Sequence, residues 1–312
     1  MAVTNKSVVL PKEYTREIFR GIVGRSKALE LGRRLRDMRT YELVLNVNSV
    51  LPVAGWVKKS QTTPNTEGAE INRKPYSEYA YDGVSITAEE LAVIIPVAEV
   101  TIADVEDIGV DLLAQISEEV IGAFQEKIDA AALFGVDAPW QNYTGLVAEA
   151  TAKGATVKWD GSVGQSFYNA ISAAMSYVVE SGFTPNAILG GPSILAAFRN
   201  SLTTLGINVT DQGEIGALAR HVDYTGGFDS SVAFAIVGDF KYLVYSIRED
   251  LRMKLLTEGV IQNPNTGDIV YNLGQQDMVA LRFTMRLGFA LPNPKTRVGG
   301  ENGYPFAVIT KE

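Results

Sequence analysis

Residues 58–75 read KKSQTTPNTEGAEINRKP, and in this stretch only Ala69 and Ile71 favour burial. Connections inside compact domains mostly have about 4–6 residues, so a polar connection of 18 residues is unusual. The stretches on its two sides, 41–57 and 76–95, are rich in β-branched and aromatic residues, which predicts strands. We therefore predict an extended β-hairpin with a polar tip. Because an isolated two-stranded hairpin is marginally stable in water, we expect a neighbouring molecule to support it.

A long helix is predicted directly after the hairpin. Thr101 to Asp104 resembles a helix-capping sequence, and residues 104–133 contain no proline. Thirty helical residues would span about 45 Å, more than twice the usual helix length. Gly135 is the predicted stop. Apolar residues recur at the three- and four-residue spacing of one helix face: Ile108, Leu112, Leu113, Ile116, Val120, Ile121, Phe124, Ile128 and Ala131.

The rest of the chain mixes helices and strands, which predicts an α+β fold. A short amphipathic helix is expected over 12–24, and 26–38 is interpreted as a helix or a mobile arm. Asp82-Gly83 and 263–267 are predicted turns, and 138–161 and 211–227 are predicted loops. Further helices are predicted at 162–180 and 193–200, and further strands at 187–190, 232–237, 241–247, 252–256 and 276–290.

The composition offers few groups for catalysis. The chain has 312 residues, no cysteine and one histidine, His221, which we expect at the surface or in an interface. Disulfides, thiolate metal sites and cysteine nucleophiles are excluded, and a single histidine cannot build the usual zinc site. No phosphate-binding loop, dinucleotide fingerprint or nucleophile elbow occurs. We therefore expect no catalytic, cofactor-binding or metal-binding residues, and no enzymatic activity.

Charge is distributed unevenly along the chain. Residues 1–40 hold ten basic and four acidic residues, a balance of +6, which leaves −14 for the remainder of a chain with net charge −8. Arg33, Arg34 and Arg36 form the densest basic cluster. A basic arm on an acidic body can bind nucleic acid or an acidic partner, and the alternative is a solvated face balanced across a subunit contact. Without a long apolar run or a signal sequence, we expect cytoplasmic synthesis and no membrane span.

The order of these parts resembles a known family. Three stretches carry the match, namely AGWVK at 54–58, ITAEELAVIIPVA at 86–98, and the helix from Asp104 to Gly135. In addition, Phe283 to Pro305 resembles the strand that returns to the peripheral domain, the domain that contains the long helix. Together they resemble the major capsid protein of tailed bacteriophages, which has the Hong Kong 97-type fold. Encapsulins and the capsid floors of herpesviruses share this fold.

The resemblance implies a domain organisation. It makes 1–45 an N-terminal arm, 46–100 the extended hairpin or E-loop with its flanking strands, and 101–160 the peripheral domain with its spine helix. Residues 161–280 become the axial domain, and 281–312 return to the peripheral domain. The E-loop is expected to contact the neighbouring subunit through its charged residues Lys58, Lys59, Glu67, Glu70, Arg73 and Lys74.

The implied function is a structural one. The resemblance makes the chain a subunit of an icosahedral phage head that forms pentamers and hexamers around double-stranded DNA, and the alternative is an encapsulin-like compartment enclosing enzyme cargo. Expected partners are further copies of the chain, scaffolding, portal and decoration proteins, and DNA bound non-specifically in a virion assembled in the host cytoplasm. Some members cross-link a lysine to an asparagine. Lys58, Lys59, Lys74 and Asn293 could occupy those positions, although such residues are ordinary in polar loops.

Overall fold

A computed structural model describes residues 25–56, 76–102, 112–162, 165–199, 214–215, 218–299 and 303–311. It divides into two compact units. The smaller unit comprises Met1–Val23, Val93–Ile121 and Met253–Phe283, and the larger comprises Gly24–Ala92, Gly122–Arg252 and Thr284–Glu312. The predicted hairpin tip, the predicted helix over 12–24 and the predicted start of the spine helix lie outside the described residues.

The larger unit contains a six-stranded sheet with the strand order β5-β14-β9-β6-β8-β7. In this sheet β14 runs parallel to β5 and antiparallel to β9, while β6 runs parallel to β8 and antiparallel to β9. Strand β7 closes the described part of the sheet by antiparallel pairing with β8. The strands are β5 (Thr156–Trp159), β6 (Ala187–Gly190), β7 (Glu214–Ile215), β8 (Leu218–Val222), β9 (Ala235–Gly238) and β14 (Phe306–Lys311).

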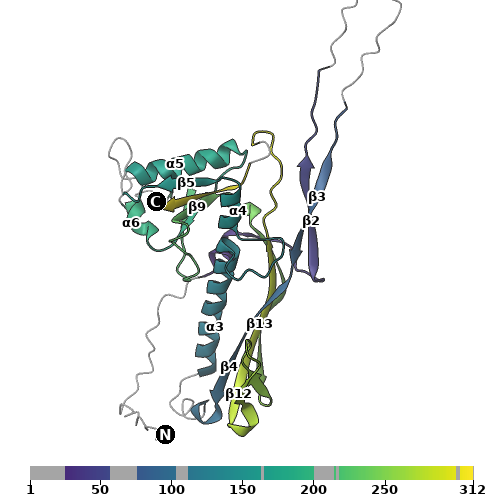
Figure 1. Ribbon diagram of the computed structural model, residues 1–312, viewed down its shortest axis with the longest axis vertical. Coiled ribbons are helices and arrows are strands. Elements are labelled where there is room, and N and C mark those ends of the chain that lie inside the picture. Colours follow the sequence, from purple (N-terminus) through teal and green to yellow (C-terminus); the bar gives the residue numbers. More distant parts are fainter. Residues whose placement is uncertain are drawn as a thin grey trace, which may run out of the picture. The chain divides into compact units, whose positions relative to one another are not determined.

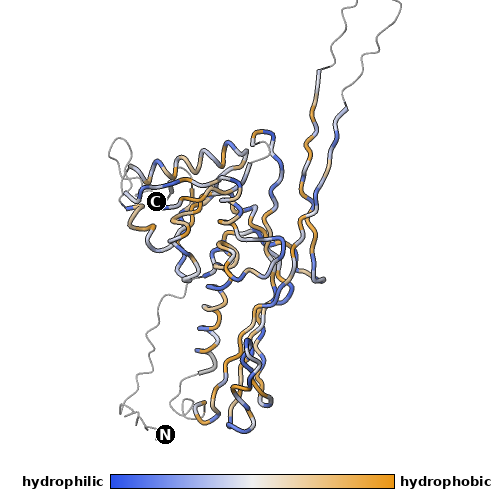
Figure 2. Tube along the Cα trace, viewed as in Figure 1, coloured by the Kyte–Doolittle hydropathy of each residue, from blue (hydrophilic) through white to orange (hydrophobic). Residues whose placement is uncertain are grey.

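The central strands of this sheet are buried on both faces. Strands covered on both sides read as continuous apolar runs rather than as alternating patterns, which explains the sequences AILG, AIVG and FAVI. Phe306 and Val308 of β14 face one core, and Ala307 and Ile309 face the other. Figure 2 shows apolar residues along these strands. The predicted buried strand at 187–190 is confirmed.

Helices cover both faces of this sheet. Helix α5 (Gln165–Glu180) and helix α6 (Ile194–Arg199) pack against the side of Ile309, and α5 is seen along the sheet in Figure 1. Helix α4 (Leu146–Ala152) packs against the side of Val308. The helices predicted at 162–180 and 193–200 are therefore confirmed, over Gln165–Glu180 and Ile194–Arg199.

The spine helix is confirmed over its described part. Helix α3 (Leu112–Asp129) continues into a π-helical turn, η1 (Ala130–Phe134), and ends at Gly135, whose φ of 74° is left-handed. A side chain at Gly135 would overlap the carbonyl oxygen of Thr144, so glycine is required there for both reasons. Ile121 was predicted on the buried face, but it is 38% exposed.

A four-stranded sheet has the order β1-β10-β13-β4. Its long strands β4 (Glu89–Ala98), β10 (Val244–Leu256) and β13 (Met278–Ala290) have residues in both units, whereas β1 (Arg33–Arg34) belongs to the larger one. Trp140 and Tyr245 pack on Phe289 of β13 with ring centroids 5.2 and 5.7 Å away. The Trp140 Nε1–H also donates to the Leu287 carbonyl at 3.1 Å, which ties the loop after η1 to β13.

Two hairpins complete the described structure. In the smaller unit β11 (Val260–Gln262) pairs with β12 (Ile269–Asn272), and Gly267 N donates to Asn263 O at 2.8 Å, which confirms the predicted turn. In the larger unit β2 (Glu42–Val50) pairs antiparallel with β3 (Ala80–Thr87), as predicted. Further helical segments are α1 (Lys27–Leu31), η3 (Phe240–Tyr242) and η4 (Leu273–Gln275).

Four predictions from local sequence signals were wrong. Asp82-Gly83 is not a turn but lies inside β3 opposite Val47 and Asn46, because cross-strand pairing outweighs the turn preference of this dipeptide. The predicted loop 138–161 contains α4 and β5, and the predicted loop 211–227 contains β7 and β8. The two strands predicted at 241–247 and 252–256 are one strand, β10, preceded by η3. The missed elements are short, so they lack a recognisable period.

We predict that Gly135→Ala destabilises the subunit much more than Gly154→Ala. Both glycines have nearly the same left-handed backbone, with φ of 74° and 73°, but no atom lies within 4 Å of an added Cβ at Gly154. Gly154→Ala should therefore cost about 1–2 kcal/mol of unfolding free energy from backbone strain alone. Gly135→Ala should cost about 1–3 kcal/mol more from overpacking. Denaturant unfolding of the unassembled subunit measures both, and equal costs would contradict this account.

Candidate inter-subunit interface

The base of the β2–β3 hairpin is anchored in its own unit. Ile86 of β3 is fully buried, and Gly288 of β13 lies directly against this part of β3, because a Cβ there would overlap the Thr87 carbonyl. Asn142 Nδ2 donates to Ser85 Oγ at 2.7 Å. The small core at this base consists of Met38, Ile86, Ala88, Val244 and Ala290, with Leu35, Leu43, Leu45 and Val84 packed around it. The hairpin therefore leaves the unit from a fixed base.

A second set of contacts holds the end of strand β2 and the residues after it. Lys295 N donates to the Asn48 carbonyl at 3.1 Å, and Arg297 Nη2 donates to the Pro52 carbonyl at 2.9 Å. These contacts come from the segment between β13 and β14, so the returning chain runs beside the hairpin. They satisfy backbone carbonyls that a lone hairpin would leave to solvent.

The hairpin beyond these contacts carries exposed apolar side chains. Trp56 is 96% exposed and Tyr76 is 86% exposed, and the neighbouring Val53 is also largely exposed. Tyr79 and Tyr81 pack edge to face at 4.7 Å, and Tyr79 OH donates to Asn48 Oδ1 at 3.1 Å, so these two tyrosines pack on the hairpin itself. Figure 1 shows β2 and β3 as the paired strands that lead to this end. We call Val53, Trp56 and Tyr76 the aromatic end.

Trp56 was not among the site residues predicted from the sequence. A signal was present, because this large apolar side chain stands only two residues before the long polar stretch 58–75. Large exposed aromatic side chains are enriched in the centres of protein interfaces. The six charged residues predicted to make the contact, Lys58, Lys59, Glu67, Glu70, Arg73 and Lys74, lie outside the described residues.

The basic cluster of the N-terminal arm lies on the edge of β10. Arg33 and Arg34 pair in parallel with Val244 and Tyr245, and Arg33 N donates to Leu243 O at 2.8 Å. Ser246 Oγ donates to the Arg36 carbonyl at 2.6 Å. The segment interpreted as a helix or a mobile arm is thus a short helix followed by a strand that is held along its backbone.

The basic side chains of this cluster are accessible to solvent. Arg33, Arg34 and Arg36 are all exposed, and only Arg34 makes an ion pair within the described part of the chain, with Asp37 at 2.9 Å. Exposed pairs of this kind contribute about 0–1 kcal/mol to stability. The structure therefore brings the three arginines together on one edge and leaves their charge available to a partner.

Residues with a potential for chemistry are dispersed. His221 is half-buried, and its Nδ1 lies 4.0 Å from Glu30 Oε1. Burial lowers the pKa of His221, and the Glu30 carboxylate opposes that shift. Within the described ranges, histidine, aspartate and glutamate side chains form no group of three that could hold a metal ion. In the same ranges, no helix is both long and apolar enough to cross a bilayer.

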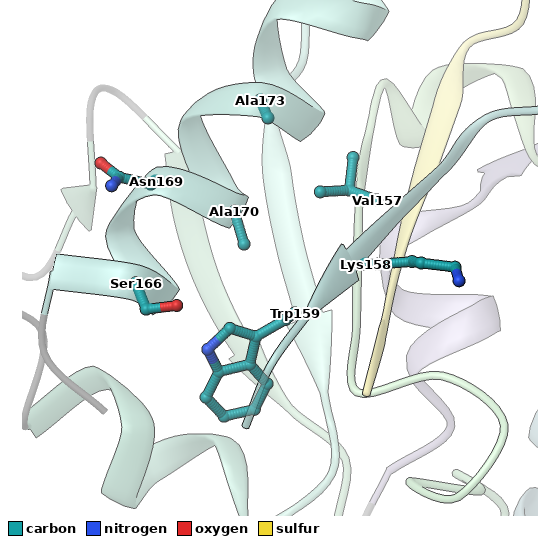
Figure 3. A pocket seen from close by; sticks show the side chains of 7 residues that line it. All are labelled: Val157, Lys158, Trp159, Ser166, Asn169, Ala170 and Ala173. Atoms are coloured by element: carbon teal, nitrogen blue, oxygen red, sulfur yellow. The ribbon is translucent and has the colours of Figure 1, made fainter. Parts of the chain in front are cut away.

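An open groove of about 490 Å³ runs between β5 and helix α5 (Figure 3). Its floor includes Trp159, whose Nε1–H donates to the Ser162 carbonyl at 2.8 Å. Figure 3 shows Lys158 directed to the other side of the strand from Trp159. Apart from Lys158, the lining offers a hydroxyl and an amide group but no carboxylate or imidazole for general acid–base catalysis. The lining residues are Val157, Lys158, Trp159, Ser166, Asn169, Ala170 and Ala173.

Asn293, the candidate for a cross-link, is held inside its own subunit. Its Nδ2 donates to the Gly303 carbonyl at 2.8 Å, and its Oδ1 is buried without a hydrogen-bond partner among the described residues. Lys58, Lys59 and Lys74 lie outside those residues, so the cross-link stays an untested prediction.

Comparison with known proteins gives a consistent result. The model of the phage capsid family matches residues 6–296. A solved structure from Microbacterium phage Oxtober96 is 30% identical, with a TM-score of 0.83, over 97% of this chain and 96% of the other. One from Mycobacterium phage Cain is 26% identical, with a TM-score of 0.82, over 98% and 96%. The capsid of a native GTA particle shares the fold at 17% identity and a TM-score of 0.62, over 99% and 98%. No curated protein sequence matches the chain.

We predict that Trp56→Ala weakens self-association without destabilising the subunit. The side chain is almost fully exposed, so its removal should change the free energy of unfolding by less than about 0.5 kcal/mol. If it is a central interface residue, each contact should weaken by about 2 kcal/mol or more, which is roughly 30-fold. Analytical ultracentrifugation measures the association, and thermal unfolding of the unassembled subunit measures the stability.

Two valines provide a matched control. Val53 lies at the aromatic end and is 71% exposed, whereas Val179 lies on helix α5 of the same unit and is 55% exposed. Val53→Ala should weaken association and Val179→Ala should not. Equal effects of the two changes would show that the aromatic end has no special part in assembly.

Proposed function

This chain belongs to the phage capsid family, and we propose that it assembles into the pentamers and hexamers of an icosahedral phage head that encloses double-stranded DNA. The chain is a structural subunit of a phage capsid shell, its α+β fold is the Hong Kong 97-type capsid fold, and it is a component of the virion.

One observation supports assembly through the hairpin most directly. The β2–β3 hairpin is anchored at its base and middle, yet Trp56 and Tyr76 at its aromatic end have almost no cover within their own unit. Exposed aromatic surface of this kind is stabilised when a partner removes it from water. In a shell the nearest partner is a second copy of the chain, and head-to-tail contacts that close on themselves produce rings.

Several finer assignments extend this proposal. Residues 46–100 act as the E-loop, and Lys58, Lys59, Glu67, Glu70, Arg73 and Lys74 contact the adjacent subunit. Charges at an interface rim set register and partner choice more than affinity. Residues 1–45 are the arm, 101–160 the peripheral domain, 161–280 the axial domain and 281–312 the return. Assembly occurs in the host cytoplasm, and the subunit catalyses no chemical step.

The partners that we propose for the N-terminal arm are inferred from its charge. Arg33, Arg34 and Arg36 present basic side chains on a chain with net charge −8, so they suit an acidic surface, either packaged DNA bound non-specifically or an acidic part of a neighbouring subunit. Scaffolding, portal and decoration proteins are the other partners that a shell of this family would use.

Electron microscopy of the purified full chain tests the assembly proposal. We expect closed shells or rings, formed by the chain alone or after a scaffolding protein from the same phage is added. A preparation that sediments only as monomer at high concentration, with that scaffolding protein present, would contradict the proposal.

We predict that Arg33→Glu combined with Arg36→Glu impairs shell assembly or DNA packaging but leaves the subunit folded. The backbone of this segment is held by β10 and both side chains are exposed, so the free energy of unfolding should change by less than about 1 kcal/mol. The measurement is the yield of DNA-filled particles from phage carrying the change.

The matched control has the same change in net charge at two other exposed sites, Lys153→Glu with Arg282→Glu. This control should yield more filled particles than the arm variant. If both variants package DNA equally well, the basic cluster is only a solvated edge.

A further inference from the structure

A buried carboxyl group joins the N-terminal arm to the spine helix. Asp129, the last residue of α3, is fully buried. Its Oδ1 accepts hydrogen bonds from Ser26 Oγ at 2.7 Å and Ala28 N at 2.9 Å, and its Oδ2 accepts one from Lys27 N at 3.0 Å. These amides belong to the start of α1, where a helix leaves backbone N–H groups without internal partners. Asp129 therefore caps α1 from another helix.

The other side of Asp129 meets the loop after β8. Thr225 Oγ1 lies 3.1 Å from Asp129 Oδ2 and 2.7 Å from Asp223 Oδ1, and it accepts a hydrogen bond from Gly227 N at 3.2 Å. Gly227 makes this approach possible, because a Cβ there would lie 3.0 Å from the Asp129 Cβ and 2.5 Å from the Glu126 carbonyl oxygen. One threonine hydroxyl thus stands between two buried carboxyl groups.

The Thr225 hydroxyl group cannot supply the hydrogen for both of its contacts with carboxyl groups. A hydroxyl has a single hydrogen, so Thr225 cannot donate to two carboxylates at once. Asp223 Oδ1 already accepts from Thr225 N at 2.7 Å and is the nearer partner of the hydroxyl, so it receives that hydrogen. The contact with Asp129 is then a hydrogen bond only if Asp129 supplies the proton from Oδ2. The chain of donors runs from Asp129 to Thr225 to Asp223.

The surrounding charges do not neutralise this pair. From α1, Lys27 is engaged by Glu30 at 2.6 Å, and His221 of β8 lies 4.0 Å from the same glutamate. Glu126 of α3 adds a further carboxylate beside the glycine loop, since its Cδ lies 3.7 Å from a Cβ placed at Gly226. Within the described residues, no basic side chain pairs with Asp129 or Asp223 and Asp223 Oδ2 is buried without a partner. Two adjacent buried charges without a counterion are unfavourable.

We propose that Asp129, Thr225 and Asp223 form a proton-dependent hydrogen-bond network that holds the N-terminal arm on the spine helix and weakens when Asp129 loses its proton. The arm continues from this network to Arg33 and Arg36 on β10, so the network fixes the position of the chain that precedes the basic cluster. It is a property of the single subunit, so it holds whether or not the assembly proposal is correct.

The direction of the pH dependence follows from the titration of Asp129. Burial raises the pKa of Asp129 to about 6, hydrogen bonds from Ala28 and Ser26 oppose the shift, and Asp223 adds to it. The folded state therefore binds the proton more tightly than an unfolded chain, in which an aspartate has a pKa of about 3.9. The contribution is fully present below that value, decreases as the pH rises, and is lost once the pH passes about 6.

Hydrogen exchange of the unassembled full chain at pH 5.5 and pH 8.0 tests the proposal. The lower value stays above the isoelectric point of about 5.0. After correction for the intrinsic exchange rates, the protection of peptides covering 25–35 should fall about fourfold at pH 8.0, the factor that the two pKa values give. Unchanged protection of the wild-type segment between the two pH values would overturn the proposal.

Variants locate the proton. Asp129→Asn is neutral at both pH values and can still donate from Nδ2 to Thr225, so its protection should differ less than twofold between them. Asp229→Asn is the matched control, because Asp229 Oδ1 accepts from Ser231 N at 2.8 Å in an equivalent but exposed turn. This control should keep the fourfold change. A pH dependence that persists in Asp129→Asn would place the proton elsewhere and contradict the proposal, and if that variant does not fold, the wild-type comparison still decides.

Discussion

The aromatic end of the hairpin is the constraint on which the account depends. Trp56 and Tyr76 are large side chains that stay exposed to solvent because their strands are fixed in place. The base of the hairpin is packed in a small core, and the segment between β13 and β14 binds the hairpin farther along. Covering each ring contributes up to about 3 kcal/mol. Rigid presentation of such groups lowers the entropy lost on association, so the subunit is organised in advance for a contact that it cannot make alone.

The arm and the spine helix belong to the same arrangement. Helix α3 ends at Asp129, whose carboxyl group caps α1, and α1 leads into the strand that places Arg33 on β10. Strand β10 and strand β13 also carry Val244 and Ala290 of the core beneath the hairpin. The two features expected to contact other molecules are therefore attached to one framework. A change in the hydrogen-bond network at Asp129 would therefore affect the position of the arm without changing the hairpin.

The sequence was informative where local and tertiary preferences agree. The apolar runs of β6 and β9 can be buried on both faces without competing signals. The helical spacing of apolar residues in α3 is repeated over enough residues to be distinguished from chance. It failed where a tertiary contact outweighs a local preference. Asp82-Gly83 forms part of a strand because Val47 and its neighbours pair across it. Helix α4 and strand β5 have seven and four residues, too few to establish a period.

The candidate site was only partly accessible from the sequence. The hairpin and the basic cluster could be found from polarity and charge, but the exposure of Trp56 depends on which segments pack beside β2, and no local pattern encodes that. Asp129 is similar. It precedes the alanine-rich turn 130–132, whose small side chains let other segments approach, yet its partners Ser26 and Thr225 lie about a hundred residues away on either side.

The most direct test of the central claim compares hydrogen exchange in the free subunit and in the assembled shell. The account predicts that peptides covering 50–56 and 76–82 become more protected on assembly, whereas the buried strand β14 is strongly protected in both states. Equal protection of the two hairpin segments in free subunit and shell would contradict the claim that a neighbouring copy covers the aromatic end.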